Sequence, residues 1–291
     1  MNNVCFIAAG DYSWGSSRMR CYWPAKYMDN AVVVQAGQPI PQADAYIWQK
    51  TIDHNFVKAT PQAKHWFDAC DPSWWWQPKE FSAIIGMVDG VACSSKALSI
   101  DLRDSMTWPI DREIPIVTIS DRLDPDHFTK QRQHREVDPV RLIWFGVSVN
   151  RVALFAALAN LERLKANGYN VELTIFDNEP QANWQHLTTV PIYHKLWSVD
   201  TEVETLASHD IALLPPYPGA WGRVKSNNKK LTAWACGLPI ADGIKYDELR
   251  RLVVEPNRRD TNFIYGTFLF WQAHHARNSA NDWQQILGRG D

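Results

Sequence analysis

A stretch near residue 230 gathers side chains that attract anions. The sequence RVKSNNKKLTAWACGLP (Arg223–Pro239) places Lys225 and Lys229 around the expected beginning of an apolar helix, where Ser226 or Asn227 can serve as the N-cap. Backbone amides at a helix N-terminus bind anions, and lysine at that end opposes the helix dipole, so its presence indicates an anionic ligand. A diphosphate at the carboxyl end of a strand is the first interpretation. A solvated basic helix face is the alternative.

A second candidate loop, AAGDYSWGSSRMR, follows the first apolar run near the N-terminus. Its glycines allow tight backbone geometry, its serines can cap the next helix, and its arginines suit an anion. These candidate residues are Gly10, Gly15, Ser16, Ser17, Arg18 and Arg20. A plain turn between a strand and a helix, with solvated arginines, is the alternative.

Other chemistry has weaker support in the sequence. His54 follows the third apolar run and can lie over a ligand site, although a lone histidine is more often structural. Asp68 and Asp71 bracket FDACD and can orient acceptor hydroxyls or cap a helix. The chain has no G-x-S-x-G, H-E-x-x-H or G-x-x-x-x-G-K-[ST] motif, so neither hydrolase, zinc-protease nor P-loop chemistry is indicated. Five widely spaced cysteines without a C-x-x-C pair predict neither disulfides nor a metal site.

The elements that must position these residues follow an alternating pattern. Short apolar, partly β-branched runs alternate with helix-like segments in the first half, at 4–9, 31–36, 45–49, 64–69, 90–95 and 114–120. A second set comprises strands at 140–146, 169–177, 191–197, 210–216 and 238–243, with an apolar helix at 151–168 that ends at a glycine. Continuous apolar strands separated by helices predict parallel sheets covered on both faces.

The fold class is therefore predicted as α/β, with two Rossmann-like doubly wound domains facing a central cleft. The expected domains are 1–120 for the acceptor and 140–260 for a nucleotide sugar, joined by a polar linker at 121–139. The terminal segment 261–291 is expected to form helices that can cross back to the first domain. A length of 291 residues suits two domains of ordinary size.

Charge and composition exclude some classes of protein. A net charge of −2 creates no general attraction to nucleic acid or anionic membranes, so any such contact requires a local patch. No signal peptide and no membrane span are apparent, and unpaired cysteines favour a reducing cytoplasm. Fifteen tryptophans, three of them consecutive at 74–76, either stack on sugars and bases or fill the core.

The chain resembles the GT-B-fold glycosyltransferases of the large retaining family (family 4-like), whose second domain carries K-S-x-N-K-x-x-E-x-x-A-x-G-x-P. The most specific match is DIALLPPYPGAWGRVKSNNKKLTAWACGLP. Weaker matches occur in order along the chain, namely GSSRMR, ADAYIWQK, FDACD, DGVACSSKAL and RLIWFG. Together they cover most of the sequence.

The resemblance implies an enzyme that moves a hexosyl or pentosyl group from a nucleotide-diphosphate sugar, UDP or GDP, to an acceptor hydroxyl with retention. Such enzymes need no metal and hold no permanent cofactor, because cations and helix dipoles neutralise the departing diphosphate. On this sequence Lys229 would contact the phosphates, with Arg151 as a second candidate. Further donor-binding positions would be Gly146, Lys225, Ser226, Asn227, Asn228 and Thr232, with Gly10, Gly15, Ser16 and Arg18 in the facing loop.

One departure from the family pattern leaves alternatives open. Thr232 stands where the family has a glutamate that accepts hydrogen bonds from the donor ribose, and a hydroxyl makes fewer and weaker bonds than a carboxylate. Glu248 is a candidate substitute. The acceptor is either a glycan or cell-surface precursor, or a hydroxymethylated DNA base as for phage enzymes. A nucleotide- or sugar-binding relative without turnover is the other alternative.

Overall fold

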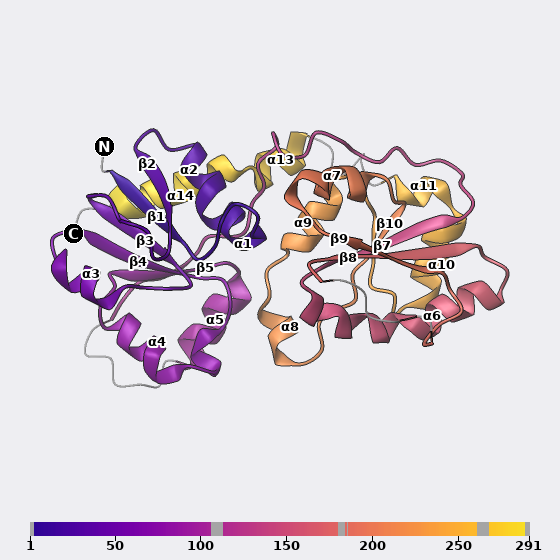
Figure 1. The fold of residues 1–291 in the computed structure, drawn as a ribbon, viewed down its shortest axis with the longest axis horizontal. Helices are drawn as coiled ribbons and strands as arrows, with labels where there is room; N and C mark the ends of the chain where they lie inside the picture. The colour runs from indigo at the N-terminus through magenta and orange to yellow at the C-terminus, as the bar shows by residue number, and fades with distance from the viewer. Residues whose placement is uncertain (1–2, 106–112, 180–183, 185, 261–267, 289–291) are drawn as a thin grey trace. The chain divides into compact units, whose positions relative to one another are not determined.

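The computed structural model describes residues 3–105, 113–179, 184, 186–260 and 268–288 (Figure 1). The chain forms two compact units. The first contains residues 1–124, 220–227 and 274–291, and the second contains residues 125–219 and 228–273. Each unit is built around one parallel sheet.

The sheet of the first unit has six parallel strands in the order β2-β1-β3-β4-β5-β6. The strands are β1 (Val4–Ala8), β2 (Ala31–Gln35), β3 (Ala45–Gln49), β4 (Lys64–Ala69), β5 (Gly90–Cys93) and β6 (Ile116–Thr118). All six lie inside the predicted apolar runs. Residues alternate between the two faces of the sheet, so each strand contributes to two cores.

Helices cover both faces of this sheet (Figure 1). The helices of the first unit are α1 (Gly15–Ser17), the π-helical η1 (Arg18–Tyr22), α2 (Trp23–Lys26), α3 (His54–Ala59), the 3₁₀ η2 (Ser73–Trp75), α4 (Pro78–Ile85), α5 (Lys96–Ser105), α8 (Ala220–Val224) and α14 (Ala276–Gly288). Phe6 packs with Ala25 of α2 and Trp283 of α14 on one face. Ile7 packs with residues of α3, α4, α5 and α8 on the other.

The sheet of the second unit has five parallel strands in the order β11-β10-β7-β8-β9. These strands are β7 (Val140–Gly146), β8 (Val171–Asp177), β9 (Ile192–Leu196), β10 (Ile211–Leu213) and β11 (Ile240–Ala241). Its helices are η3 (Ser148–Leu154), α6 (Phe155–Ala166), α7 (Val199–Ala207), α9 (Asn228–Ala235), α10 (Tyr246–Val254), α11 (Pro256–Arg259) and α13 (Phe268–His274), the last of which ends in the first unit. In Figure 1, α6 and α10 lie on one face of the sheet and α7 and α9 on the other.

The helix predicted at 151–168 begins differently from its prediction. Residues Ser148–Leu154 form a 3₁₀ helix, and α-helical geometry begins only at Phe155. The predicted left-handed glycine after the helix is confirmed, because Gly168 has φ +83°. The predicted α/β class with two parallel sheets is likewise confirmed.

The unit boundaries differ from the expected linear division. Asp121 and Asp124 belong to the first unit, and 125–139 belong to the second, where Arg132 pairs with buried Asp210. Part of the segment expected as a linker therefore packs within the units, and residues such as Asp126 and Lys130 are exposed. Of the terminal segment, 261–267 and 289–291 lie outside the described residues, and α14 packs in the first unit. Within the described ranges, no helix combines the length and hydropathy that a membrane span requires.

Candidate active site

Lys229, at the beginning of α9, lies against the last residue of β7. Its Nζ is 4.9 Å from the ring centroid of Trp144, and a Cβ built on Gly146 would stand 2.3 Å from that Nζ. A side chain at position 146 would therefore displace the ammonium group, and the φ of +155° at Gly146 also favours glycine. The side-chain oxygen of Asn228 accepts a hydrogen bond from the Lys229 amide at 2.6 Å. These contacts place a positive charge at the carboxyl end of a strand, where anionic ligands bind in α/β sheets.

Thr232 lies one turn further along α9 and is 4% exposed. The structure thus buries the position at which the family motif has glutamate. Glu248, the candidate substitute, lies on α10, where its carboxylate pairs with Lys245 at 2.9 Å and is 60% exposed. The carboxylate of Glu248 therefore forms an ion pair with Lys245 at a solvent-exposed position of α10.

Arg151, on η3, is held by Asp177 at the end of β8. Its Nη2 donates to Asp177 Oδ1 at 2.6 Å and to the Glu179 carbonyl at 2.8 Å, and its Nε donates to Asp177 Oδ2. His194 of β9 also contacts Asp177, with 3.0 Å between Nε2 and Oδ1. Burial acts to raise the pKa of Asp177, but the hydrogen bonds from Arg151, Glu179 and His194 outweigh it and lower that pKa. The structure therefore places Arg151 in an ion pair that ties η3 to β8.

The loop after β1 is closed by hydrogen bonds around Ser17. Ser17 Oγ accepts from the Gly10 amide at 3.2 Å and donates to Gln49 Oε1 at 3.1 Å. A Cβ on Gly10 would lie 2.4 Å from the ring of Trp14, whereas one on Gly15 would meet nothing closer than 3.9 Å. Of these two glycines, only Gly10 therefore lacks room for a side chain.

The predicted serine cap is wrong, because α1 has no side-chain capping bond and Ser17 is used between the loop and β3. Ser16, on α1, is half-buried.

The two arginines of this loop are buried. Arg18 Nη1 donates to the carbonyl oxygens of Ser13 at 2.8 Å and Tyr12 at 3.3 Å. Arg20 forms a bidentate pair with Asp68 and also contacts Asp121 at 3.3 Å. Both guanidinium groups therefore brace the loop and the strand ends of the first unit.

The lysine-rich motif is divided between the two units. Residues 220–227 belong to the first unit, where Val224 is buried and its carbonyl accepts from Ser95 Oγ at 2.9 Å. Ser226 Oγ donates to Asp121 Oδ2 at 2.5 Å, so Ser226 does not cap α9. Asn227, which is exposed, ends the segment. Lys225 lies with its Nζ 4.5 Å from the ring centroid of Trp221.

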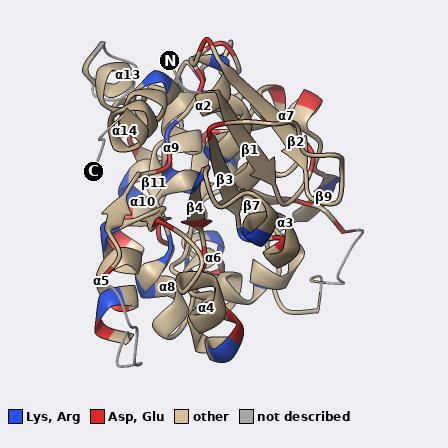
Figure 2. Cartoon of the chain, turned by 90° about the vertical axis from the view of Figure 1, so that its left-hand side faces the viewer, with Lys and Arg blue, Asp and Glu red and all other residues tan. Residues whose placement is uncertain are grey.

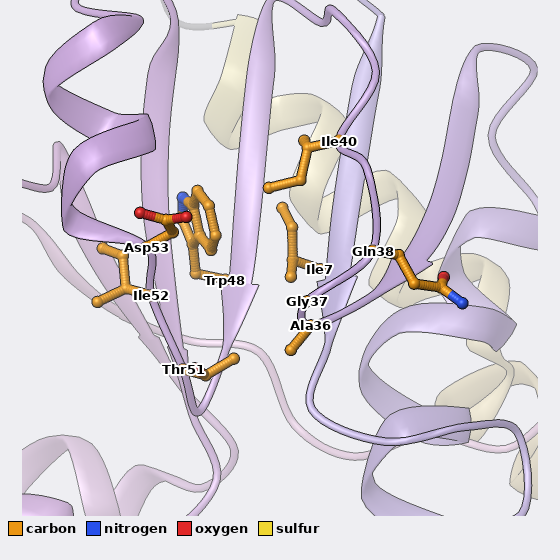
Figure 3. A pocket seen from close by; sticks show the side chains of 9 residues that line it. All are labelled: Ile7, Ala36, Gly37, Gln38, Ile40, Trp48, Thr51, Ile52 and Asp53. Carbon is orange, nitrogen blue, oxygen red and sulfur yellow. The ribbon is translucent and has the colours of Figure 1, made fainter.

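A hollow of about 180 Å³ opens beside the carboxyl ends of β1, β2 and β3. Its lining is Ile7, Ala36, Gly37, Gln38, Ile40, Trp48, Thr51, Ile52 and Asp53. Figure 3 shows the side chains of Trp48, Ile7 and Ile40 close together, with Asp53 beside Trp48. His54 follows Asp53 at the exposed start of α3. This hollow was not predicted from the sequence. Gly37 and the polar residues that follow the ends of β2 and β3 were the sequence features that could have indicated it.

Comparisons with known proteins identify the fold of this chain but do not assign the chain to a family. No family model matches the chain, and no curated protein matches it. An alpha-glucosyltransferase in complex with UDP-glucose and DNA containing an abasic site is similar, with TM-score 0.71, 10% identity and 99% of each chain covered. Another complex, with UDP and a 13-mer DNA containing a HMU base, has TM-score 0.67, 9% identity, and covers 99% of this chain and 100% of that chain.

Longer glycosyltransferase-type chains also match. The α,α-trehalose 6-phosphate synthase of Burkholderia multivorans gives TM-score 0.57 and 9% identity over 84% of this chain and 70% of that chain. The GtfA/B complex gives TM-score 0.57 and 13% identity over 85% of this chain, and the match spans 57% of its chain. At these identities the likeness concerns the fold. The chain has the two-domain fold of the GT-B glycosyltransferases.

Proposed function

We propose that this chain is a metal-independent, retaining glycosyltransferase that moves a sugar from a UDP-sugar to an acceptor hydroxyl. The observation that carries the proposal is the Lys229 ammonium, held over Gly146 at the start of α9. When the bond to the sugar breaks, negative charge develops on the departing diphosphate. A lysine fixed in advance, together with the positive end of a helix, stabilises that charge more than it stabilises the uncleaved donor.

The other predicted residues take supporting roles in this proposal. Asn228 orients the Lys229 amide, and Thr232 lies beneath the donor in place of the family glutamate. Arg151 acts through Asp177 to fix the loop after β7, within which a phosphate would lie. UDP is favoured as the nucleotide because similar chains of nearly equal length are named as complexes with UDP or UDP-glucose. The five unpaired thiols suit an enzyme of the reducing cytoplasm.

A donor panel tests this function. UDP-, GDP- and ADP-sugars are incubated with the protein, and nucleotide release and thermal stabilisation are recorded. We expect UDP to stabilise the protein and at least one UDP-sugar to be hydrolysed slowly without acceptor. Absence of stabilisation and of release with every donor would contradict the proposal. Tight UDP binding with no transfer to any acceptor would instead select the binding relative without turnover, for which the buried Thr232 is the supporting observation.

A hydroxymethylated DNA base is the acceptor that we favour over a glycan. The similar alpha-glucosyltransferases named with DNA match this chain over 99% of its length. The hollow of about 180 Å³ in the first unit is large enough for one ring. Figure 2 shows basic and acidic residues interspersed on helices such as α4 and α5, so attraction to DNA requires a local site. Transfer to a hydroxymethylcytosine oligonucleotide but not to its cytosine counterpart would support this acceptor.

A further inference from the structure

The hollow of the first unit combines apolar walls with one charged residue. Its apolar lining is Ile7, Ala36, Ile40, Trp48 and Ile52, and its polar lining is Gln38, Thr51 and Asp53 (Figure 3). A Cβ built on Gly37 would meet nothing within 4 Å, so the loop after β2 leaves open space there. The lining therefore suits a flat, mainly apolar ring that carries a group for Asp53 to bind.

The wall formed by Trp48 is rigid. Its indole N–H donates to His65 Nδ1 at 3.1 Å, and its ring packs edge-on against Phe56, with centroids 5.8 Å apart. Trp48 is 1% exposed and belongs to the same core cluster as Ile7. A preformed wall of this kind loses little conformational freedom when a ring packs on it.

Asp53 offers one carboxylate oxygen to a ligand. Its Oδ1 accepts from the backbone amides of Asn55 at 2.9 Å and Phe56 at 3.0 Å, so Asp53 is the N-cap of α3. These two bonds fix the carboxylate beside the hollow. Its Oδ2 makes no hydrogen bond with the residues that the structure describes. An ionised carboxylate only accepts, so Oδ2 requires a ligand that donates.

This chemistry fits an amino-bearing pyrimidine better than a sugar or a keto pyrimidine. A sugar ring carries hydroxyl groups around its edge, and the apolar walls would leave several of them without partners. The exocyclic amino group of cytosine donates to a carboxylate, whereas uracil has a carbonyl oxygen at that position, which a carboxylate repels. The ring N–H of uracil lies between two such carbonyl oxygens. The carboxylate therefore favours cytosine.

We propose that the hollow receives the acceptor base and that Asp53 Oδ2 accepts from its exocyclic amino group, so that Asp53 selects hydroxymethylcytosine over hydroxymethyluracil. As an acceptor-selecting role, this assignment rests on the proposed function. As a base-binding site, it is tested without a donor. Asp53 and the hollow belong to the first unit, whereas Lys229 belongs to the second, so base selection and donor binding can be altered separately.

Fluorescence anisotropy tests the assignment with single-stranded oligonucleotides that contain one hydroxymethylcytosine or one hydroxymethyluracil. We expect the wild type to bind the hydroxymethylcytosine strand roughly 10- to 100-fold more tightly, the effect of one hydrogen bond to a charged group. Asp53→Asn should bind both strands nearly equally, because an amide presents either its oxygen or its NH₂ group to the base. Asparagine caps helices as well as aspartate does, so α3 should remain intact.

Three further variants complete the test. Asp44→Asn is the matched control for the carboxylate, because exposed Asp44 also accepts from a backbone amide, that of Asn3 at 2.8 Å, but lies before β3 and outside the hollow. Ala36→Phe, at an exposed lining position, should fill the hollow and abolish the preference. Val32→Phe, at a position of β2 that is 49% exposed and outside the hollow, should keep it.

Binding of UDP is measured in the same variants by thermal shift, and folding is checked by circular dichroism. Loss of the base preference in Asp53→Asn, with UDP binding retained, supports the assignment. Equal binding of the two strands by the wild type overturns it, as does a preference that survives in folded Asp53→Asn. No strand binding at low salt, or displacement of the strand by a neutral maltooligosaccharide, also overturns it. A base preference without any UDP binding would count against the proposed donor chemistry and would leave the base site supported.

Discussion

At the scale of single residues, the donor half of the site depends on a reciprocal fit. The ammonium of Lys229 occupies the space that a side chain at position 146 would fill. One residue supplies the charge, and the other supplies the room for it. The Lys229 Nζ also makes a cation–π contact with Trp144, at 4.9 Å from the ring centroid. Charge and space can therefore be removed separately by mutation.

Removal of the charge gives the first prediction. Lys229→Ala should lower the rate of UDP-sugar cleavage roughly 100- to 1,000-fold, the usual cost of one preorganised electrostatic contact to a developing anion. The melting temperature should change little, because Lys229 is only half-buried. Steady-state kinetics and thermal melts check both quantities. Lys230→Ala, at the exposed neighbouring position, is the control, and equal losses in the two variants would remove Lys229 from the mechanism.

Removal of the space gives the second prediction. Gly146→Ala keeps every charge but brings a methyl group to 2.3 Å from Nζ, so the ammonium must move. We expect the KM for donor to rise and kcat to fall, with a loss that approaches that of Lys229→Ala. Gly168→Ala, at a position with nothing within 4 Å, is the control for strain at positive φ. A normal rate in Gly146→Ala would show that the lysine position is not critical.

At the scale of elements, the ion pair of Arg151 with Asp177 joins η3 to β8 and gives a pH-dependent prediction. The folded-state pKa of Asp177 lies below its ordinary value of 3.8. Its ionised form therefore stabilises the fold above that value, and the contribution disappears as the pH falls through the lowered pKa. Asp177→Asn should lower the free energy of unfolding by roughly 3 kcal/mol near pH 7, as for a broken buried pair.

The difference between wild type and Asp177→Asn should shrink as the pH falls below about 4, where the unfolded chain takes up the proton first, and should vanish below the lowered folded-state pKa, where the carboxylate is protonated in both states. Urea unfolding at several pH values measures it. Glu204→Gln removes an exposed ion pair with Lys130 and should cost less than about 1 kcal/mol at any pH. A constant difference between pH 3 and 7 for Asp177→Asn would contradict the assignment.

The positions of the strands could be predicted from the sequence more completely than the contacts of individual side chains could. Apolar runs such as 45–49 and 64–69 gave the strands because buried parallel strands are continuously apolar. The role of Arg20 was not predictable, since its carboxylate partners Asp68 and Asp121 lie 48 and 101 residues away. Arg18 bonds carbonyl groups only five and six residues away, but the loop conformation that brings them to its guanidinium has no local sequence pattern. The motif at Lys225 to Lys229 was found by its residue types, but its division between units depends on the burial of Val224, which no local pattern marks.

At the scale of the whole molecule, neither unit is continuous in sequence. The first unit takes its main segment from the N-terminus, an insertion from 220–227 and the last helix from 274–291. Val224 enters one of its cores and Trp283 the other. The cores of the first sheet therefore include residues that follow the second sheet in sequence, so the compact units differ from the expected linear pair of domains.

The last helix provides the test of this arrangement. Trp283 is 1% exposed and packs edge-on against Phe6 and Trp66, with centroids 6.3 and 6.1 Å away. Trp283→Ala should therefore lower the free energy of unfolding by roughly 3–5 kcal/mol, as for other large buried aromatics. Urea titration followed by far-UV circular dichroism measures the loss, with Trp76→Ala as the half-exposed control. Because Lys229 lies in the second unit, UDP should still stabilise the variant under conditions where it is folded. A loss below about 1 kcal/mol would mean that the first sheet is complete without α14.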